Sequence, residues 1–248
     1  MNNFELSQIK QKILSIEPSK YWGDDFDVRY HVISKLKETK NQLILDAGGG
    51  IGIITSDISK ENMVINLDLN FNDLVICKTK TSKTTQNING VMNFLPFRDS
   101  IFDQIICCHV LDVGKAIDIK NKNMITKKIN RYPTMEKILD EFKRTLKRDG
   151  KLTLTVPNNV FYKKAALEYE ELKSALAETF PEHSLYFFNT FPKLGNSRKL
   201  NLANMIPKII SKIIGQRSTL QRLLRKEDNK KRYSISFYVE ATKEDGMK

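Results

Sequence analysis

The sequence predicts an α/β protein whose sheet is mostly parallel and covered by helices on both faces. Short runs rich in Ile, Val, Leu and Phe alternate along the chain with longer amphipathic stretches. The runs are too short for helices, so we interpret them as strands, and alternation of this kind is typical of doubly wound sheets. A glycine-rich turn after the first run indicates a ligand-binding crevice at the edge of that sheet.

Seven runs predict the strands. They are Leu43–Ala47, Met63–Leu67, Gly90–Met92, Phe102–Cys108, Lys151–Val156, Ser184–Phe188 and Ser234–Val239. The segment Met135–Leu146 predicts a helix because its apolar residues fall on one helical face, and we expect Asp149 and Gly150 to end it. Another helix is expected to start at about Ile53, directly after the glycines.

The chain is predicted to contain an N-terminal helical cap, one large domain and an insertion. Apolar residues at helical spacing place the cap at residues 1–40, with its second helix ending at about Leu36. The domain covers residues 41–248. A basic stretch at about 193–232, called the basic insertion below, is predicted to be helical and to precede the last strand.

The basic insertion carries most of the charge of the chain. Its 12 Lys and Arg against 2 acidic residues give 12 − 2 = +10, of a net charge of +12. Within it, residues 206–226 place Ile and Leu on one helical face and the basic residues off that face. Such a helix either contacts an anionic membrane peripherally or packs on the domain as a lid over the substrate.

Composition predicts a cytoplasmic protein, with or without peripheral attachment to a membrane. No apolar run approaches the length of a transmembrane helix, and the first residues do not resemble a signal peptide. The three cysteines, Cys77, Cys107 and Cys108, form no CxxC pair. A disulfide framework or a metal site is therefore not expected, and a reducing compartment fits.

The stretch Leu43–Thr55 reads LILDAGGGIGIIT and joins a strand to a helix through a glycine turn. Glycines at Gly48, Gly50 and Gly52 permit positive φ and let a ligand touch the backbone. The dinucleotide fingerprint GxGxxG/A is not met, because the third glycine comes one residue early and Ile53 stands at the small-residue position. The spacing therefore disfavours NAD.

Two acids flank the glycine turn. Asp46 ends the first strand, and Asp68 ends the second strand about 20 residues past the glycines. A carboxylate at Asp68 can accept both hydroxyls of a ribose, whereas Asp46 suits a ligand with a positive end and would repel a pyrophosphate. An isolated Asp68 would also fit a helix N-cap. Together, the acids and glycines predict a bound nucleoside that carries a sulfonium.

From Leu43 to Asn158 the chain resembles the class I S-adenosylmethionine-dependent methyltransferases, in their type 11-like branch that acts on small molecules. LILDAGGGIG resembles the first motif of the family, and INLDLN resembles its ribose-binding acid. The segments NGVMNFLPFRDSIFDQIICCHVLD and EFKRTLKRDGKLTLTVPN resemble its third to fifth strands and the helix between them. The resemblance implies a Rossmann-like sheet of seven strands whose last strand is antiparallel.

The resemblance also implies a site for S-adenosylmethionine. The implied cofactor-binding residues are Asp46, Ala47, Gly48, Gly49, Gly50, Gly52, Asp68, Leu69, Asn93, Leu95 and Cys108. Leu69 and Leu95 are expected near the adenine. The family often places an acidic residue and Ala where this chain has Val91 and Met92, so Asn93 is the nearest polar side chain for the adenine amino group.

Methyl transfer from a sulfonium requires alignment, and it requires a base when the acceptor loses a proton. His109 and Asp112 are the candidates for that base, and a packing or loop-orienting role fits each equally well. The Asn/Asp-Pro-Pro-Tyr turn and the glutamate pair that mark base-amino and arginine methyltransferases are missing after the fourth strand.

We therefore expect a methyltransferase with a small-molecule or lipid-linked acceptor, methylated on oxygen or carbon. The alternatives are an RNA-directed methyltransferase that uses the basic insertion, and a non-catalytic methyltransferase-like binding protein. Nucleic acid is the less favoured partner, because the basic insertion has Ile and Leu where RNA binders interleave aromatic residues.

Overall fold

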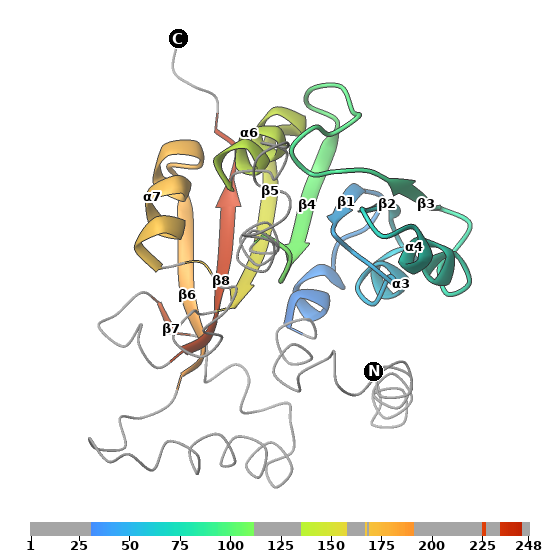
Figure 1. The fold of residues 1–248 in the computed structure, drawn as a ribbon, viewed down its shortest axis with the longest axis horizontal. Coiled ribbons are helices and arrows are strands. Elements are labelled where there is room, and N and C mark those ends of the chain that lie inside the picture. Colours follow the sequence, from blue (N-terminus) through green and yellow to red (C-terminus); the bar gives the residue numbers. More distant parts are fainter. Residues whose placement is uncertain are drawn as a thin grey trace, which may run out of the picture.

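The fold is described from a computed structural model over residues 31–111, 135–157, 167, 169–190, 225–226 and 234–244 (Figure 1). One eight-stranded sheet has the order β3-β2-β1-β4-β5-β8-β6-β7. The strands are β1 (Leu43–Ala47), β2 (Met63–Asp68), β3 (Thr85–Asn89), β4 (Phe102–Cys108), β5 (Leu146–Pro157), β6 (His183–Thr190), β7 (Arg225–Lys226) and β8 (Ser234–Thr242). The described helices are α3 (Thr55–Ile58), α4 (Phe71–Lys78), α6 (Met135–Thr145) and α7 (Tyr169–Thr179), together with residues 31–36.

The strand order creates a switch point between β1 and β4. From β1 the chain moves outward to β2 and β3, and then returns to β4 on the other side of β1. In such sheets a ligand binds beyond the carboxyl ends of the strands where the order reverses. The glycine turn after β1 and the residues that follow β4 therefore lie at the expected crevice.

The strands from β1 to β5 pair in parallel, as the sequence predicts. Strand β8 pairs antiparallel with both β5 and β6, so it is the reversed strand that the family resemblance implies. The sheet contains one strand more than the seven expected, because the two-residue β7 pairs with the outer edge of β6.

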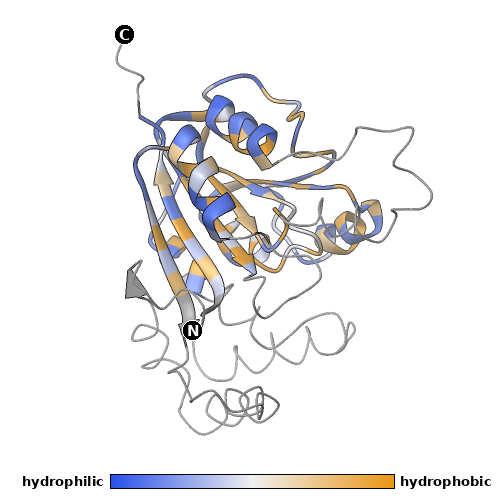
Figure 2. Ribbon diagram, turned by 60° about the vertical axis from the view of Figure 1, so that its left-hand side comes forward, coloured by the Kyte–Doolittle hydropathy of each residue, from blue (hydrophilic) through white to orange (hydrophobic). Residues whose placement is uncertain are grey.

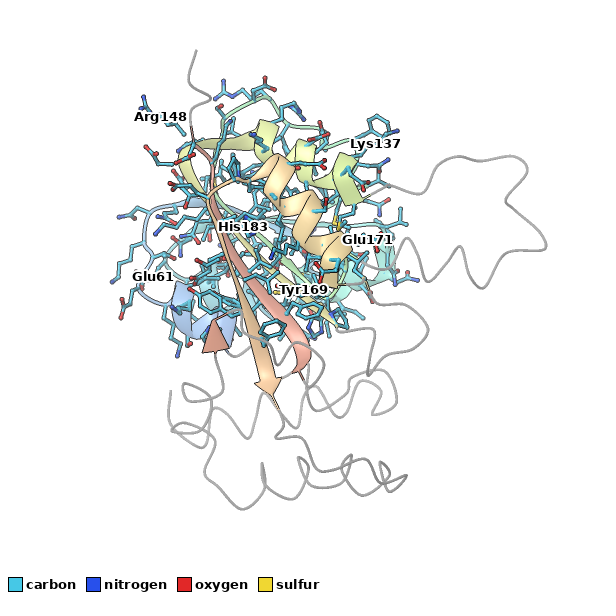
Figure 3. All side chains as sticks on the ribbon, turned by 90° about the vertical axis from the view of Figure 1, so that its left-hand side faces the viewer. Glu61, Lys137, Arg148, Tyr169, Glu171 and His183 are labelled. Carbon is cyan, nitrogen blue, oxygen red and sulfur yellow. The ribbon has the colours of Figure 1, made fainter. Side chains whose placement is uncertain are left out.

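Helices cover both faces of the sheet and divide its core into two layers. On one face α6 and α7 bury large apolar residues such as Phe142 and Leu176 against β4, β5 and β8. Figure 3 looks onto this layer, with Lys137 of α6 and Glu171 of α7 labelled on the two helices. On the other face, residues 31–36 and α3 pack against β1, β2 and β4. In Figure 2 the helices carry both hydrophilic and hydrophobic residues along their length, as expected for helices that bury one face.

Several predicted element bounds are wrong, among them the start of β5, which is Leu146 instead of Lys151. The third strand is β3 at Thr85–Asn89, and the predicted run Gly90–Met92 follows it as loop. Because β3 is an edge strand and only half-buried, its sequence TQNIN carries little of the apolar signal that marks a central strand. Helix α6 ends at Thr145, four residues before Asp149, and the chain passes directly into β5.

The helix after the glycines is α3, which begins at Thr55 instead of Ile53. Gly52 has φ +77°, and the turn that it makes delays the start of regular helix. The expected end of the second cap helix at Leu36 is confirmed, while residues 1–30 of the predicted cap lie outside the described residues.

Most of the basic insertion lies outside the described residues. Its amphipathic helix was placed at residues 206–226, and within that range the structure describes Arg225–Lys226, which form β7. The helix therefore does not extend to Lys226. None of the helices in the described part of the chain is long and apolar enough to cross a membrane.

Candidate cofactor site

The glycine turn has the backbone conformation that its sequence predicts. Gly48, Gly50 and Gly52 have φ values of +74°, +54° and +77°, in the left-handed region that favours glycine. A Cβ atom at Gly48 would lie 2.6 Å from a methyl group of Val110, and one at Gly52 would collide with the Cys77 sulfur. Burial raises the pKa of the Cys77 thiol, so this side chain stays protonated beneath the turn.

Gly50 differs from its neighbours because a Cβ atom there would make only ordinary van der Waals contacts. A Cβ atom built there would have its nearest described neighbour at 3.8 Å, the Oδ2 atom of Asp68, and the next at 4.0 Å, the Oδ2 atom of Asp73. The bare backbone at Gly50 therefore lines a cradle whose wall is formed by carboxylate oxygens. Carboxylates accept hydrogen bonds from the hydroxyl groups of a ligand.

The Asp68 carboxylate is held at the mouth of this cradle by two backbone groups. Its Oδ2 atom accepts a hydrogen bond from the Gly50 N–H at 2.9 Å, and its Oδ1 atom accepts one from the Asn70 N–H at 2.8 Å. Each carboxylate oxygen has a further lone pair available. The predicted ribose-binding acid is thus already oriented, with room to accept two hydroxyl groups.

Asp46 lies beneath the glycine turn and is almost fully buried, with 1% of its surface exposed. The Thr55 hydroxyl, at the start of α3, donates a hydrogen bond to its Oδ2 atom at 2.6 Å. A Cβ atom at Gly49 would come within 2.6 Å of the same Oδ2 atom, so this carboxylate packs directly against the turn. Asp46 is therefore a support of the turn as well as a predicted cofactor residue.

Asn66 is a site residue that sequence reasoning missed. It is fully buried on β2, and its Nδ2 group donates hydrogen bonds to the Gly50 carbonyl at 3.0 Å and to the Asn87 side chain at 3.2 Å. The sequence signal that could have found it is a polar amide side chain inside the otherwise apolar run of β2. Thr55 was missed as well, because nothing in the sequence around it marks a bond to Asp46.

The residues expected near the adenine differ in exposure. Leu69, directly after β2, has 68% of its surface exposed, whereas Leu95 is buried in the core layer beneath α6. Asn93 is 8% exposed, and its Oδ1 atom has no hydrogen-bond partner in the described part of the chain. A buried amide oxygen without a partner is costly, and a ligand N–H group can satisfy it.

Of the two candidate bases, the structure describes His109. His109 directly follows β4 with φ 55°, a conformation that histidine adopts infrequently. Its backbone N–H donates a hydrogen bond to the Thr155 backbone carbonyl at 2.9 Å. Asp112 lies outside the described residues. Cys108 is buried in the core layer beside Ile106 and Tyr238, and Ala47 at the end of β1 is fully buried as well.

Comparisons with known proteins show which proteins the chain is similar to in sequence and in fold. Residues 45–154 match the sequence model of the family described as "Methyltransferase domain". An uncharacterized protein of Methanocaldococcus jannaschii is 31% identical over 127 residues, which is 51% of this chain and 46% of that protein. The ubiquinone/menaquinone biosynthesis C-methyltransferase UbiE of Wigglesworthia glossinidia brevipalpis is 29% identical over 165 residues, or 63% of this chain and 53% of that enzyme.

The chain thus spans about half the length of these curated relatives. Among solved structures, an S-adenosylmethionine-dependent methyltransferase of Thermotoga maritima has a TM-score of 0.57 at 14% identity and covers 96% of this chain and 99% of its own. The matches support S-adenosylmethionine as the cofactor, as the sequence predicts. Residues 45–154 therefore match a methyltransferase domain, and the chain has the fold seen in S-adenosylmethionine-dependent methyltransferases.

Proposed function

We propose that this protein transfers the methyl group of S-adenosylmethionine to a small-molecule or lipid-linked acceptor. The observation that carries the proposal is the bare backbone at Gly50 beside the Asp68 carboxylate, which two backbone N–H groups orient. A nucleoside cofactor requires this combination, because its ribose hydroxyls need acceptors and its body needs a surface free of side chains.

The residues present fit the cofactor along its length. Asp68 would accept the ribose hydroxyls, and the backbone from Gly48 to Gly52 would line the ribose and the methionine part. The unpartnered Oδ1 atom of Asn93 would accept the adenine amino group. Asp46, held by Thr55, would fix the turn and contribute negative charge near the amino end.

The chemistry at the reacting centre divides between cofactor and protein. When bound, the cofactor supplies an electrophilic methyl group that is already activated by the sulfonium. The protein must hold the acceptor atom in line behind that methyl group and keep water out, and alignment of this kind contributes on the order of 7–11 kcal/mol. The residues after β4 stand next to the switch point, where this alignment would take place.

His109 is our proposal for the group that receives a proton from the acceptor. Its backbone is fixed by the hydrogen bond to Thr155, and a left-handed conformation in a histidine is a form of strain that concentrates at functional sites. Asp112 remains the other candidate base from the sequence. A proton acceptor is needed when the methylated atom carries a hydrogen that must leave.

The relative named for C-methylation in ubiquinone and menaquinone biosynthesis supports a carbon acceptor on a quinone-type ring. The basic stretch that starts at residue 206 agrees with such an acceptor, because an amphipathic helix there would bring the enzyme to an anionic membrane surface. We therefore favour a lipid-linked ring over a water-soluble acceptor.

Calorimetry tests the cofactor part of the proposal. We expect the full chain to bind S-adenosylmethionine and S-adenosylhomocysteine, and Asp68→Ala to weaken both by about 1–3 kcal/mol because the ribose hydroxyls lose their acceptors. Glu61→Ala is the matched control, since Glu61 is an exposed carboxylate that lies just before the start of β2, whereas Asp68 lies at its end. Wild-type protein that binds neither ligand would refute the proposed cofactor.

A tritiated-methyl screen tests the acceptor part. Wild-type protein and Asp68→Ala are incubated with tritiated S-adenosylmethionine and, separately, with lipid, small-molecule and RNA fractions of the host. We expect label in the lipid fraction, with far less from the variant. Label confined to RNA would replace the proposed acceptor with a nucleic acid, and no label in any fraction despite tight cofactor binding would favour a binding protein.

A further inference from the structure

Two charged residues of α6 hold the loop that follows β3. Glu141 and Arg144 lie three residues apart on the helix and form a bidentate pair, with Arg144 Nε 2.8 Å from Glu141 Oε1 and Arg144 Nη2 2.8 Å from Glu141 Oε2. Paired charges with this planar geometry are stronger and more directional than ordinary surface ion pairs. We call these two residues the α6 clamp.

The α6 clamp binds both backbone groups of one loop residue. Glu141 Oε2 accepts a hydrogen bond from the Leu95 N–H at 2.8 Å, and Arg144 Nη2 donates one to the Leu95 carbonyl at 3.1 Å. Arg144 Nη1 also donates to the Phe97 carbonyl at 2.8 Å and to the Asp99 carboxylate at 2.7 Å. The side chains of α6 therefore bind backbone groups of the loop after β3 that would pair with a neighbouring strand if the loop were part of the sheet.

The charge states of the α6 clamp are secure at neutral pH. The hydrogen bonds from Arg144 are the main cause that holds the pKa of the Glu141 carboxyl below its ordinary value, against the opposing effect of burial, and the Leu95 N–H adds to it. Side-chain exposure is 20% for Glu141 and 32% for Arg144, so solvent screens the pair only in part.

The loop held by the α6 clamp carries the polar group that we propose for the adenine. Asn93 lies two residues before Leu95, and its buried Oδ1 atom has no partner in the described part of the chain. The Leu95 side chain packs in the core layer beneath α6, and the Phe97 ring packs edge-on against Phe102 at 5.0 Å. The segment is thus fixed by α6 and by the core, while the Asn93 oxygen has no hydrogen-bond partner among the described residues.

We infer that Glu141 and Arg144 are positioning residues for adenine recognition, which they support by fixing the loop that presents Asn93. The inference rests on the proposed function, because it needs the adenosine end of the cofactor to bind beside Asn93. A loop that is ordered before the ligand arrives does not have to be ordered at the expense of binding energy. Loss of the α6 clamp should therefore weaken adenosine recognition without changing the glycine turn.

Ligand affinities of three variants test the inference. Arg144→Lys keeps the charge and removes the planar fork, and Glu141→Gln keeps the shape and removes the charge. We expect each to weaken S-adenosylhomocysteine and 5′-methylthioadenosine by the same factor, about 5- to 50-fold, because both ligands share the adenosine end. Lys147→Met is the control, since it breaks another ion pair near the end of α6, to Asp103 at 2.7 Å.

Asp99→Asn is a milder variant of the same hydrogen-bond network, and it tests the inference even if the α6 variants fail to fold. Asp99 is largely exposed, with 73% of its side chain accessible, and it contributes one acceptor to Arg144, so we expect a folded protein and a weakening of about two- to fivefold. Asn93→Ala should reproduce the loss for both ligands and add little to Arg144→Lys in a double variant, because the two changes act through the same contact.

The outcomes separate this inference from the proposed function. Failure of the wild-type protein to bind S-adenosylhomocysteine would refute the proposed function. The inference is wrong if the wild-type protein binds S-adenosylhomocysteine and Arg144→Lys binds it equally well. The α6 clamp is then purely structural, whether or not Arg144→Lys loses stability as Lys147→Met does. A loss for S-adenosylhomocysteine with none for 5′-methylthioadenosine would also overturn it, because the effect would then lie at the methionine end.

Discussion

The Asp68 carboxylate and the Gly50 backbone are joined by a 2.9 Å hydrogen bond from the Gly50 N–H to Asp68 Oδ2. The end of β2 is thereby tied to the turn that follows β1, across the parallel pairing of these two strands. The acid proposed for the ribose also holds the surface on which that ribose would lie. Ligand affinity and local stability should therefore change together when this residue is altered.

Asp68→Asn tests both roles of the carboxylate. The amide keeps one acceptor oxygen, so it cannot serve the N–H groups of both Gly50 and Asn70 through two oxygens as the acid does. We expect the free energy of unfolding to fall by roughly 1 kcal/mol and S-adenosylhomocysteine to bind about tenfold more weakly. Urea titration and calorimetry measure the two effects. Weaker stability with unchanged ligand affinity would assign Asp68 to the turn alone.

Alanine substitutions at two glycines should differ in stability. Gly50→Ala places a side chain in the left-handed region at a cost of about 1–2 kcal/mol, but its Cβ atom would make only ordinary van der Waals contacts. Gly52→Ala adds a collision with Cys77, so its urea midpoint should fall further. Gly50→Ala should nevertheless lose more ligand affinity, because its methyl group fills the cradle. Equal losses of stability would show that steric contact with Cys77 is relieved at no cost.

Two buried threonines provide a matched pair. Thr55 and Thr155 are both fully buried, but Thr55 donates to Asp46 while the Thr155 hydroxyl has no partner in the described part of the chain. Thr55→Val should reduce the free energy of unfolding by about 1–3 kcal/mol, because it removes one hydrogen-bond donor from a buried carboxylate. Thr155→Val should leave that free energy unchanged or raise it. A loss above roughly 1 kcal/mol for Thr155→Val would reveal a partner that the geometry does not provide.

Stability should fall as the pH drops from neutrality, and His31 should be one cause. Burial, followed by the nearby Lys35, lowers the pKa of this histidine from 6.5 to about 4, while Glu240 opposes the shift. Below pH 6.5 the unfolded chain binds a proton that the folded protein does not, so stability is lost progressively between pH 6.5 and about 4. Urea titrations at several pH values in this range measure the slope.

His31→Phe tests this assignment. The His31 ring packs edge-on against Tyr238 at 4.8 Å, and phenylalanine keeps an aromatic ring in that place without a titrating group. We expect the variant to lose less stability than the wild-type protein between pH 7 and pH 5. Parallel pH profiles for the two proteins would assign the slope to carboxyl groups instead.

The central part of the fold could be predicted because its strands are buried on both faces. The bounds of β1 and β4 agree with the predicted runs, since continuous apolar residues mark a central parallel strand. Edge strand β3 escaped detection for the opposite reason, because none of its residues is fully buried and its sequence is polar. Strand β7 has two residues and offers no periodic signal at all.

The site shows the same division between local and long-range signals. Gly48, Gly50 and Asp68 could be found because a turn and a strand end have local sequence signatures. Asn66 and the α6 clamp could not, since their roles arise from contacts between residues that are far apart in the chain, such as Glu141 with Leu95. The cofactor-binding or catalytic roles of all the predicted site residues, Gly48, Gly50 and Asp68 included, stay predictions.

Strand β8 lies between β5 and β6, although the chain reaches it after both. During synthesis from the N-terminus, the edge of β5 must therefore stay unpaired until residues 234–242 have left the ribosome. An exposed edge of this kind invites intermolecular strand pairing. Folding of the nascent chain should thus depend on how quickly the long segment between β6 and β8 is translated, and slow translation there would favour aggregation.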